Sequence, residues 1–249
     1  MCSAPFQRLR SKQVGGAPLF GALTGFARTS ELTNWETGMI QLYTWKTPNG
    51  RKAAIMLEEI GLPYRVHAVD LTADEQHAQA FLAISPSNKI PAIVDEAAGR
   101  GGQPLFESGA ILSYLAEKSG MLLAPSGPAR WSVLEWLYWS IGGLGPMLRQ
   151  LNFYAVRSDE KAPLAIDRFR KEGERLLRVL ETRLSDQLYI GGADYSIADV
   201  ASYSWVEEAR VVMAEPLGKA FAASPAIADW LALVGERPAV QKGMRILEA

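Results

Sequence analysis

Between residues 40 and 118 the chain alternates between two patterns of apolar and polar positions. Short runs of β-branched and aromatic residues end at Gly or Pro, and longer runs are built from good helix formers. The expected strands are 40–46, 64–71, 92–95 and 104–106, and the expected helices are 51–60 and 108–118, with weaker helical character at 74–82. This order, βαβ, a connection and then ββα, predicts a mixed sheet covered by helices.

A different pattern follows residues 119–128, where two prolines and two glycines interrupt the chain. Strand signals vanish beyond this point, and long helical segments are separated by short turns. The expected helices are about 129–157, 163–186, 196–213 and 225–235. The two patterns predict an α/β domain at 39–120 followed by an all-α domain at 129–249.

Residues 1–38 fit neither pattern. The first 30 residues contain four basic side chains and no Asp or Glu, a bias that is typical of transit peptides. Two simpler readings are a flexible extension and a mis-assigned start, with Met39 as the true first residue, because Met39 directly precedes a strand-like run. We expect one of these two readings, since residues 1–30 show no convincing amphipathic helix.

The composition narrows the possible chemistry. The 249 residues are 48% hydrophobic and 21% charged, with a net charge of −1 and scattered basic residues, so we expect neither a nucleic-acid nor a membrane partner and predict a cytoplasmic protein. Cys2 is the single cysteine, and His67 and His77 are the two histidines, which leaves too few ligands for a thiolate or imidazole metal site. Any reactive group is therefore expected to come from a bound small molecule.

The segment T-P-N-G at 47–50 has the features of a helix start that stabilises a thiolate. Thr47 suits the N-cap and Pro48 the first helical position, so free N–H groups and the positive end of the helix dipole face whatever precedes them. The pKa of a thiol falls at such a place, and the Thr47 hydroxyl and the Asn49 amide are both possible donors to the sulfur. An ordinary capped helix without a ligand is the alternative.

Two further motifs suit a peptide ligand. In N-K-I-P-A-I at 88–93, a cis bond between Ile90 and Pro91 would expose the Ile90 backbone to an added strand, and a trans turn is the alternative. In F-E-S-G at 106–109, Glu107 can accept from an ammonium group, and Ser108 at a helix start can bind an anion. Together Glu107 and Ser108 suit an α-amino acid moiety, and a ligand-free helix cap is the alternative.

The three motifs, in this order and spacing, resemble the amino-terminal domain of glutathione transferases, which has a thioredoxin-like fold. The resemblance covers essentially all of 39–249. It includes Y-S-I-A-D at 195–199, where Ser196 caps a helix and Asp199 reaches back, and G-E-R-P-A-V at 235–240. Within the family, T-P-N-G, Gln76, S-P-S-N-K-I-P at 85–91 and G-G-L-G-P-M at 142–147 resemble the bacterial Nu class.

The resemblance implies roles for residues that match the class. Thr47 and Asn49 would contact the glutathione sulfur as the catalytic pair, and Ile90, between Lys89 and Pro91, would pair with the cysteinyl backbone. Glu107 and Ser108 would hold the γ-glutamyl end. Gln76 would lie near the glycyl end, which Arg168 would reach from the helical domain of the same or the neighbouring subunit.

The function implied is that of a homodimeric, glutathione-dependent disulfide-bond oxidoreductase acting on a small-molecule disulfide, without a metal. The alternatives are conjugation of glutathione to an electrophile, glutathione peroxidase activity, and a non-catalytic binding module of the same fold.

Other side chains receive structural interpretations. Tyr43 is expected to be a sheet residue, and Lys46, Arg51 and Lys52 are expected to be solvated charges. The apolar helix that carries Trp131, Trp136, Tyr138 and Trp139 is expected to be buried or to form a subunit interface, with an acceptor pocket as the alternative. Its glycines and proline at 142–146 are expected to bend it and to let another group approach closely.

Overall fold

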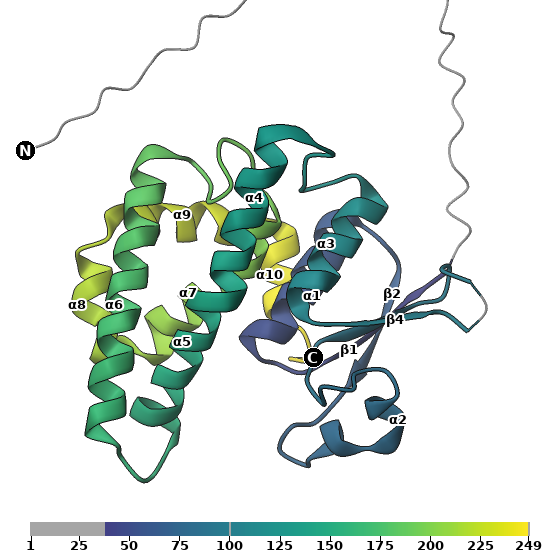
Figure 1. Cartoon of the computed structure of the whole chain (residues 1–249), viewed down its shortest axis with the longest axis horizontal. Coiled ribbons are helices and arrows are strands. Elements are labelled where there is room, and N and C mark those ends of the chain that lie inside the picture. The colour runs from purple at the N-terminus through teal and green to yellow at the C-terminus, as the bar shows by residue number, and fades with distance from the viewer. Residues whose placement is uncertain (1–37, 100, 249) are drawn as a thin grey trace, which may run out of the picture. The chain divides into compact units, whose positions relative to one another are not determined.

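The computed structural model describes residues 38–99 and 101–248 (Figure 1). Except for Gly38, the extension expected at 1–38 lies outside these residues. The elements in chain order are β1 (Ile40–Thr44), α1 (Pro48–Ile60), β2 (Tyr64–Ala68), η1 (Glu75–His77), α2 (Gln79–Leu82), β3 (Ala92–Asp95), β4 (Gln103–Phe106), α3 (Ser108–Ser119), α4 (Gly127–Trp139), η2 (Ser140–Leu144), α5 (Gly145–Leu151), η3 (Asn152–Arg157), α6 (Pro163–Asp186), α7 (Ile197–Val212), α8 (Ala214–Ala222), α9 (Pro225–Gly235) and α10 (Pro238–Met244).

The strands of the described chain form one mixed sheet in the order β2-β1-β3-β4. β1 pairs in parallel with β2 and antiparallel with β3, which in turn pairs antiparallel with β4. Leu42 in β1 lies opposite Val66 and Ile93, so its register fixes the middle of the sheet. The thioredoxin-like sheet domain followed by a helical domain confirms the predicted fold class.

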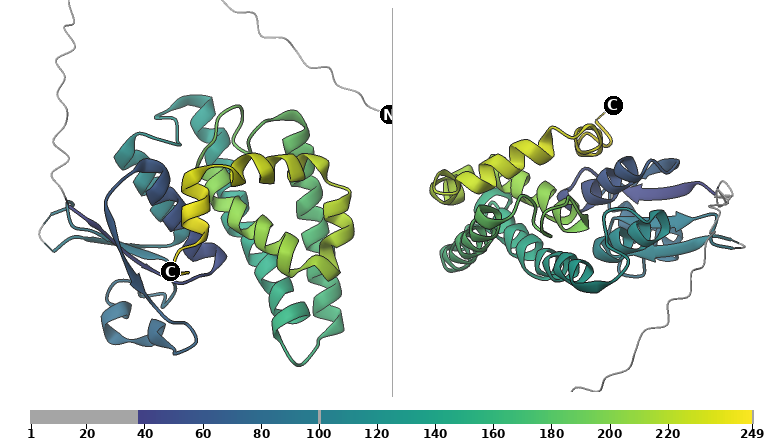
Figure 2. Two further views of the ribbon diagram at one scale, coloured as in Figure 1. Left: turned by 180° about the vertical axis from the view of Figure 1, so that it is seen from behind. Right: turned by 90° about the horizontal axis from the view of Figure 1, so that it is seen from above.

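Helix α1 connects the sheet to the rest of the molecule. It begins at the Thr47 cap and ends at Gly61, whose φ of 66° is readily adopted because glycine has no Cβ. Its buried face, which includes Ile55, Met56 and Leu57, packs against α3, α7 and α10. α10 returns to α1 at the end of the chain (Figure 2).

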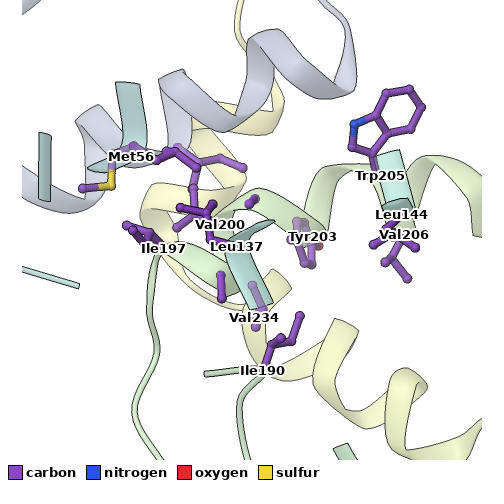
Figure 3. Packing of buried hydrophobic residues seen from close by; sticks show 14 of the residues in the cluster. Met56, Leu137, Leu144, Ile190, Ile197, Val200, Tyr203, Trp205, Val206 and Val234 are labelled. Atoms are coloured by element: carbon purple, nitrogen blue, oxygen red, sulfur yellow. The ribbon is translucent and has the colours of Figure 1, made fainter. Parts of the chain in front are cut away.

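The helical domain surrounds α7, which is buried along most of its length. A continuous apolar cluster includes Met56 of α1, Leu137 of α4 and Val200 of α7 (Figure 3). Ser196 caps α7 and forms the predicted capping box with Asp199. The helix α7, which contacts the site described below, is therefore buried and well packed.

The helix expected at 129–157 is not uniform. It continues from α4 to η3, but two segments have π-helical hydrogen bonding, Ser140–Leu144 and Asn152–Arg157. The first contains Gly142 and Gly143, which weaken a regular helix. Two short helices, α8 and α10, were not expected, because Pro216 and Gly218 in α8 and Gly243 in α10 are poor helix signals.

The described helices were also compared with the requirements for crossing a bilayer. None of them is individually long and apolar enough, although α8 and α9 together meet the length and composition requirement with a bend of 104° between them.

Candidate functional site

The start of α1 has the geometry expected of a capped helix. Thr47 is extended, with φ −123° and ψ 160°, and its Oγ accepts a hydrogen bond of 3.2 Å from the Gly50 N–H. Pro48 follows at the first helical position, where its missing N–H leaves no bond unmade. The Thr47 hydroxyl keeps its own hydrogen for a ligand, and the positive end of the helix dipole lies at the same place.

Asn49 is oriented by a residue of the helical domain. The indole Nε1–H of Trp205, on α7, donates to Asn49 Oδ1 at 2.9 Å. Because indole nitrogen is a donor only, this bond identifies the amide oxygen and leaves the Asn49 NH₂ group as the free donor. The neighbouring Ser204 Oγ donates to the Pro48 carbonyl at 2.8 Å, so α7 holds the first turn of α1 at two successive positions.

Trp205 lies against Gly145, the first residue of α5. A Cβ built on Gly145 would lie 2.9 Å from Trp205 Nε1, which is closer than a real side chain tolerates. The predicted close approach at these glycines is therefore confirmed at Gly145, and the group that approaches is the indole that orients Asn49.

Two neighbouring clefts open beside this helix start. The larger has a volume of about 430 Å³, and its wall includes Thr47, Asn49, Gln76, Lys89 and Ile90. The smaller, of about 60 Å³, is lined in part by Pro91, Glu107 and Ser108, and shares Asn49, Lys89 and Ile90 with the larger. Eight of the nine predicted site residues thus lie around adjoining clefts.

The Ile90–Pro91 bond is cis, the first of the two alternatives. Ile90 precedes the first ladder pair of β3, which joins Ala92 to Phe106, so its backbone lies outside the sheet ladder, and the residue lines both clefts. This arrangement suits pairing with an extended peptide ligand.

The smaller cleft ends at the start of α3. Ser108 is the first residue of this helix and is buried, whereas the preceding Glu107 is exposed with a positive φ of 68°. An accepting carboxylate therefore lies next to a helix N-terminus, which can receive an ammonium group and a carboxylate of one ligand.

Gln76 and Arg168 differ in their placement. Gln76 Nε2 donates to Asp74 Oδ1 at 3.1 Å, while its buried Oε1, in the wall of the larger cavity, has no partner among the described residues. Arg168 lies exposed on α6 and belongs to the wall of neither cleft.

Sequence reasoning missed one wall of the larger cavity. It consists of Trp205 and Glu208 on α7 and of four side chains on α5 and η3, namely Arg149, Asn152, Phe153 and Arg157. Arg149, Phe153 and Arg157 follow the four-residue spacing of one helix face, and the two arginines were the available signal. None of the aromatic residues considered for an acceptor pocket lies in this wall, and Trp131 and Tyr138 are 68% and 69% exposed.

Lys46 is exposed, as expected of a solvated charge, whereas Arg51 and Lys52 differ from that expectation. Arg51 forms ion pairs of 3.5 Å with Glu208 and 3.4 Å with Glu248. Lys52 is 1% exposed, and burial lowers its pKa to about 7. The interpretation of Lys52 as a solvated charge was therefore wrong, because the apolar face of α1 carries it into the interior.

Tyr43 behaves as a residue of the sheet. Its ring stacks on that of His67 with 4.6 Å between centroids, and His67 Nε2 lies 2.6 Å from Gln41 Oε1. Tyr43 is absent from the walls of both clefts. Within the residues that the structure covers, no three His, Cys, Asp or Glu side chains form a group suited to a metal ion.

Known proteins share both halves of this architecture. The family model for the glutathione S-transferase N-terminal domain matches residues 38–117, and that for the C-terminal domain matches residues 163–233. The chain is 44% identical over 216 residues to the disulfide-bond oxidoreductase YfcG of Escherichia coli K12, a match that covers 85% of this chain and 96% of that protein.

Solved structures agree with the sequence comparison. A glutathione transferase family member from Pseudomonas fluorescens Pf-5, with two glutathione molecules bound, superposes with a TM-score of 0.78 at 42% identity, covering 84% of this chain and 94% of that one. A Pseudomonas putida glutathione transferase with one glutathione disulfide per subunit gives 0.78 at 43% identity, covering 84% and 92%. The chain therefore belongs to the glutathione S-transferase family, and within that family it resembles the bacterial Nu class.

Proposed function

We propose that this protein is a glutathione-dependent disulfide-bond oxidoreductase that uses the thiolate of bound glutathione as its nucleophile. One observation carries the proposal, the hydrogen bond that fixes the Asn49 amide so that its NH₂ group is free to donate at the start of α1. The name of the Escherichia coli relative and the glutathione disulfide bound to the Pseudomonas putida structure also support it.

In this proposal glutathione lies across the two clefts in one direction. Its cysteinyl backbone would pair with Ile90, beside Lys89 and Pro91, which places the sulfur near Thr47 and Asn49. The γ-glutamyl ammonium and carboxylate would meet Glu107 and the α3 start at Ser108. The glycyl end would extend toward Gln76, and Arg168 would act from the partner subunit of a homodimer, because it lies away from the clefts of its own chain.

The chemistry requires two glutathione molecules. The first thiolate attacks one sulfur of a disulfide RSSR, so that a mixed disulfide forms and RS⁻ leaves to take a proton from solvent. A second glutathione thiolate attacks the glutathione sulfur of the mixed disulfide and releases the second RS⁻. Overall, two glutathione thiols are oxidised to glutathione disulfide and RSSR is reduced to two thiols.

The described part of the polypeptide contributes no thiol to these two steps. The single cysteine is Cys2, and the described residues therefore contain none. Thr47 and Asn49 are neutral donors, so together with the helix end they lower the pKa of the bound thiol only moderately. A thiolate of moderate pKa keeps its nucleophilicity toward sulfur.

The remaining features of the proposal concern organisation. We assign residues 39–120 and 129–249 to the two domains and 1–38 to an extension outside them. A homodimer is supported by the exposed Trp131 and Tyr138 on α4, and a mass measurement in solution tests it. A cytoplasmic location is consistent with the need for a reduced glutathione pool.

The decisive experiment compares three substrates at one glutathione concentration: a neutral disulfide, an aromatic halide and an organic hydroperoxide. We expect kcat/KM for the disulfide to exceed that for the halide by at least about tenfold. Asn49→Ala should lower turnover about 10- to 100-fold, as expected for loss of one donor to a developing anion, whereas Tyr43→Phe should change it less than about twofold.

The alternatives predict other results. A tenfold advantage for the halide would establish conjugation as the main activity, and a similar advantage for the hydroperoxide would establish peroxidase activity. Retention on immobilised glutathione without turnover of any of the three would identify a binding module.

A further inference from the structure

We propose that the wall formed by α5 and η3 selects a second substrate that carries carboxylates next to its disulfide, through Arg149 and Arg157. This inference rests on the proposed function and names the substrate class of the same site. It concerns the part of the larger cavity that the glutathione contacts described above leave unused.

The wall has a regular construction. Arg149, Phe153 and Arg157 lie at intervals of four residues, so they share one face of the continuous helix from α5 to η3, and Asn152 adjoins Phe153. All four line the larger cavity, and none lines the smaller cleft that holds Glu107 and Ser108. They face the same space as Thr47 and Asn49 but come from the opposite domain.

The charge of this wall is unbalanced. Within the described chain, no ion pair involves the side chain of Arg149, Arg157 or Lys89, the third cation of the cavity wall. Glu208, the carboxylate of the same wall, already faces Arg51 at 3.5 Å. The cavity therefore concentrates positive potential in a protein whose net charge is −1, and such a cavity attracts anions.

Three other arginines of the helical domain provide a contrast. Arg170, Arg175 and Arg210 each pair with a carboxylate three or four residues away on the same helix. Arg149 and Arg157 have no acidic side chain at the corresponding positions of their own helix, as the run from Gly145 to Arg157 contains none. Their charge is available to a ligand.

Asn152 supplies a second, independent observation. Asn152 is 5% exposed and lies between Arg149 and Arg157 along the helix that forms the wall. Its Oδ1 has no hydrogen-bond partner among the described residues. A buried amide oxygen without a partner is unfavourable, and a ligand N–H would satisfy it. The half-exposed ring of Phe153 offers an apolar contact for the disulfide sulfurs.

These features together describe the substrate. It carries carboxylates for the arginines, a polar hydrogen for Asn152 and an apolar centre for Phe153, as disulfides derived from acidic amino acids or peptides do.

The test uses three disulfides of similar length that differ in charge: the dianion dithiodipropionate, the neutral bis(2-hydroxyethyl) disulfide and the dication cystamine. After subtraction of the uncatalysed rates, we expect kcat/KM to be about tenfold higher for the dianion than for the neutral compound, and lowest for the dication. The advantage should shrink as salt is added, because both arginines are exposed.

The variant Arg149→Gln/Arg157→Gln should reduce the preference for the dianion to within about twofold, because kcat/KM should fall further for the dianion than for the neutral compound. Its matched control is Arg178→Gln/Arg245→Gln, which removes two exposed arginines outside both clefts and should leave the preference intact. Equal thermal unfolding temperatures would show that both variants fold.

A binding measurement separates this inference from the proposed function. With unreactive S-methylglutathione filling the first site, dithiodipropionate should bind about tenfold more tightly than bis(2-hydroxyethyl) disulfide, and only the Arg149/Arg157 variant should lose this difference. Turnover of the neutral disulfide without any preference for the dianion would overturn the inference and leave the function intact. If no disulfide were turned over but dithiodipropionate still bound more tightly than the neutral compound, the proposed function would be overturned and the anion site would remain.

Discussion

The amide of Asn49 carries two polar ends, and the indole of Trp205 occupies one of them. The bond of 2.9 Å to Oδ1 prevents the amide from flipping, so the NH₂ group is presented to the sulfur before glutathione arrives. Preorganised donors of this kind stabilise charge without reorganising during the reaction. Trp205 therefore acts as a positioning residue, through Asn49.

Trp205→Phe tests this role. Loss of the indole N–H should lower kcat about 3- to 10-fold, leave KM for glutathione nearly unchanged, and move the ionisation of the bound thiol to higher pH, because one hydrogen bond of ordinary strength then no longer fixes the donor. The thiolate absorbance of bound glutathione, measured against pH, reports the shift directly.

Ser204→Ala is the matched control. It removes the adjacent bond from α7 to the Pro48 carbonyl without touching the Asn49 amide. A thiol titration altered equally in both variants would mean that Trp205 only holds the domains together.

Lys52 makes stability depend on pH. Its pKa is about 7 in the folded protein against an ordinary value of 10.5, because burial disfavours its charge. Between these values the unfolded chain binds a proton that the folded protein does not, so stability rises with pH across the window from 7 to 10.5. Below pH 7 both states are protonated, and the folded state bears the full cost of the buried charge.

Lys52→Met should therefore stabilise the protein most at neutral and acidic pH, by about 1–4 kcal/mol, and flatten the rise above neutrality. Urea unfolding of both proteins at several pH values measures the difference. If the wild-type curve were flat from neutral to alkaline pH, the lysine would not be titrating in the folded state.

At the scale of elements, α7 depends on its first turn. Asp199 accepts hydrogen bonds from the backbone N–H groups of Ser196 and Ile190, from the Ser196 hydroxyl and from Trp230 Nε1, all between 2.9 and 3.0 Å. Its side chain is fully buried. One carboxylate thus satisfies the cap, the preceding loop and α9 together.

Asp199→Ala should lower the free energy of unfolding by about 3 kcal/mol or more, since four donors lose their acceptor in a buried place. Ser202→Ala, which removes a hydroxyl bonded only to the Ala198 carbonyl of its own helix, should cost less than about 1 kcal/mol. Denaturant unfolding compares the two variants, and similar losses would show that the cap contributes little.

Local signals explain which elements were predictable. The strand and helix at 40–60 are marked by β-branched residues, by the Thr47 cap and by Gly61, and all of these act within a few residues. The π-helical turn at 152–157 has no such marker, because no glycine or proline interrupts that stretch. The helix was foreseen, but not its π-helical end, which carries three residues of the cavity wall.

The whole molecule brings together what no local pattern links. Thr47, Ile90 and Glu107 were predictable because each belongs to a recognisable motif. Trp205 donates to Asn49 across 156 residues of sequence. This pairing could not be predicted from one sequence, because any buried tryptophan on an apolar helix has the same local pattern. The burial of Lys52 was hidden for the same reason, because α7 and α10, which cover α1, follow more than 130 residues later.

The bond between Trp205 and Asn49 also matters for recombination among relatives. A hybrid that takes its sheet half from this chain and its helical half from a relative with another side chain at the tryptophan position would inherit every motif of the glutathione site. Its amide would nevertheless be free to rotate. In shuffled libraries, activity should therefore follow the matching of these two residues more closely than it follows overall sequence identity.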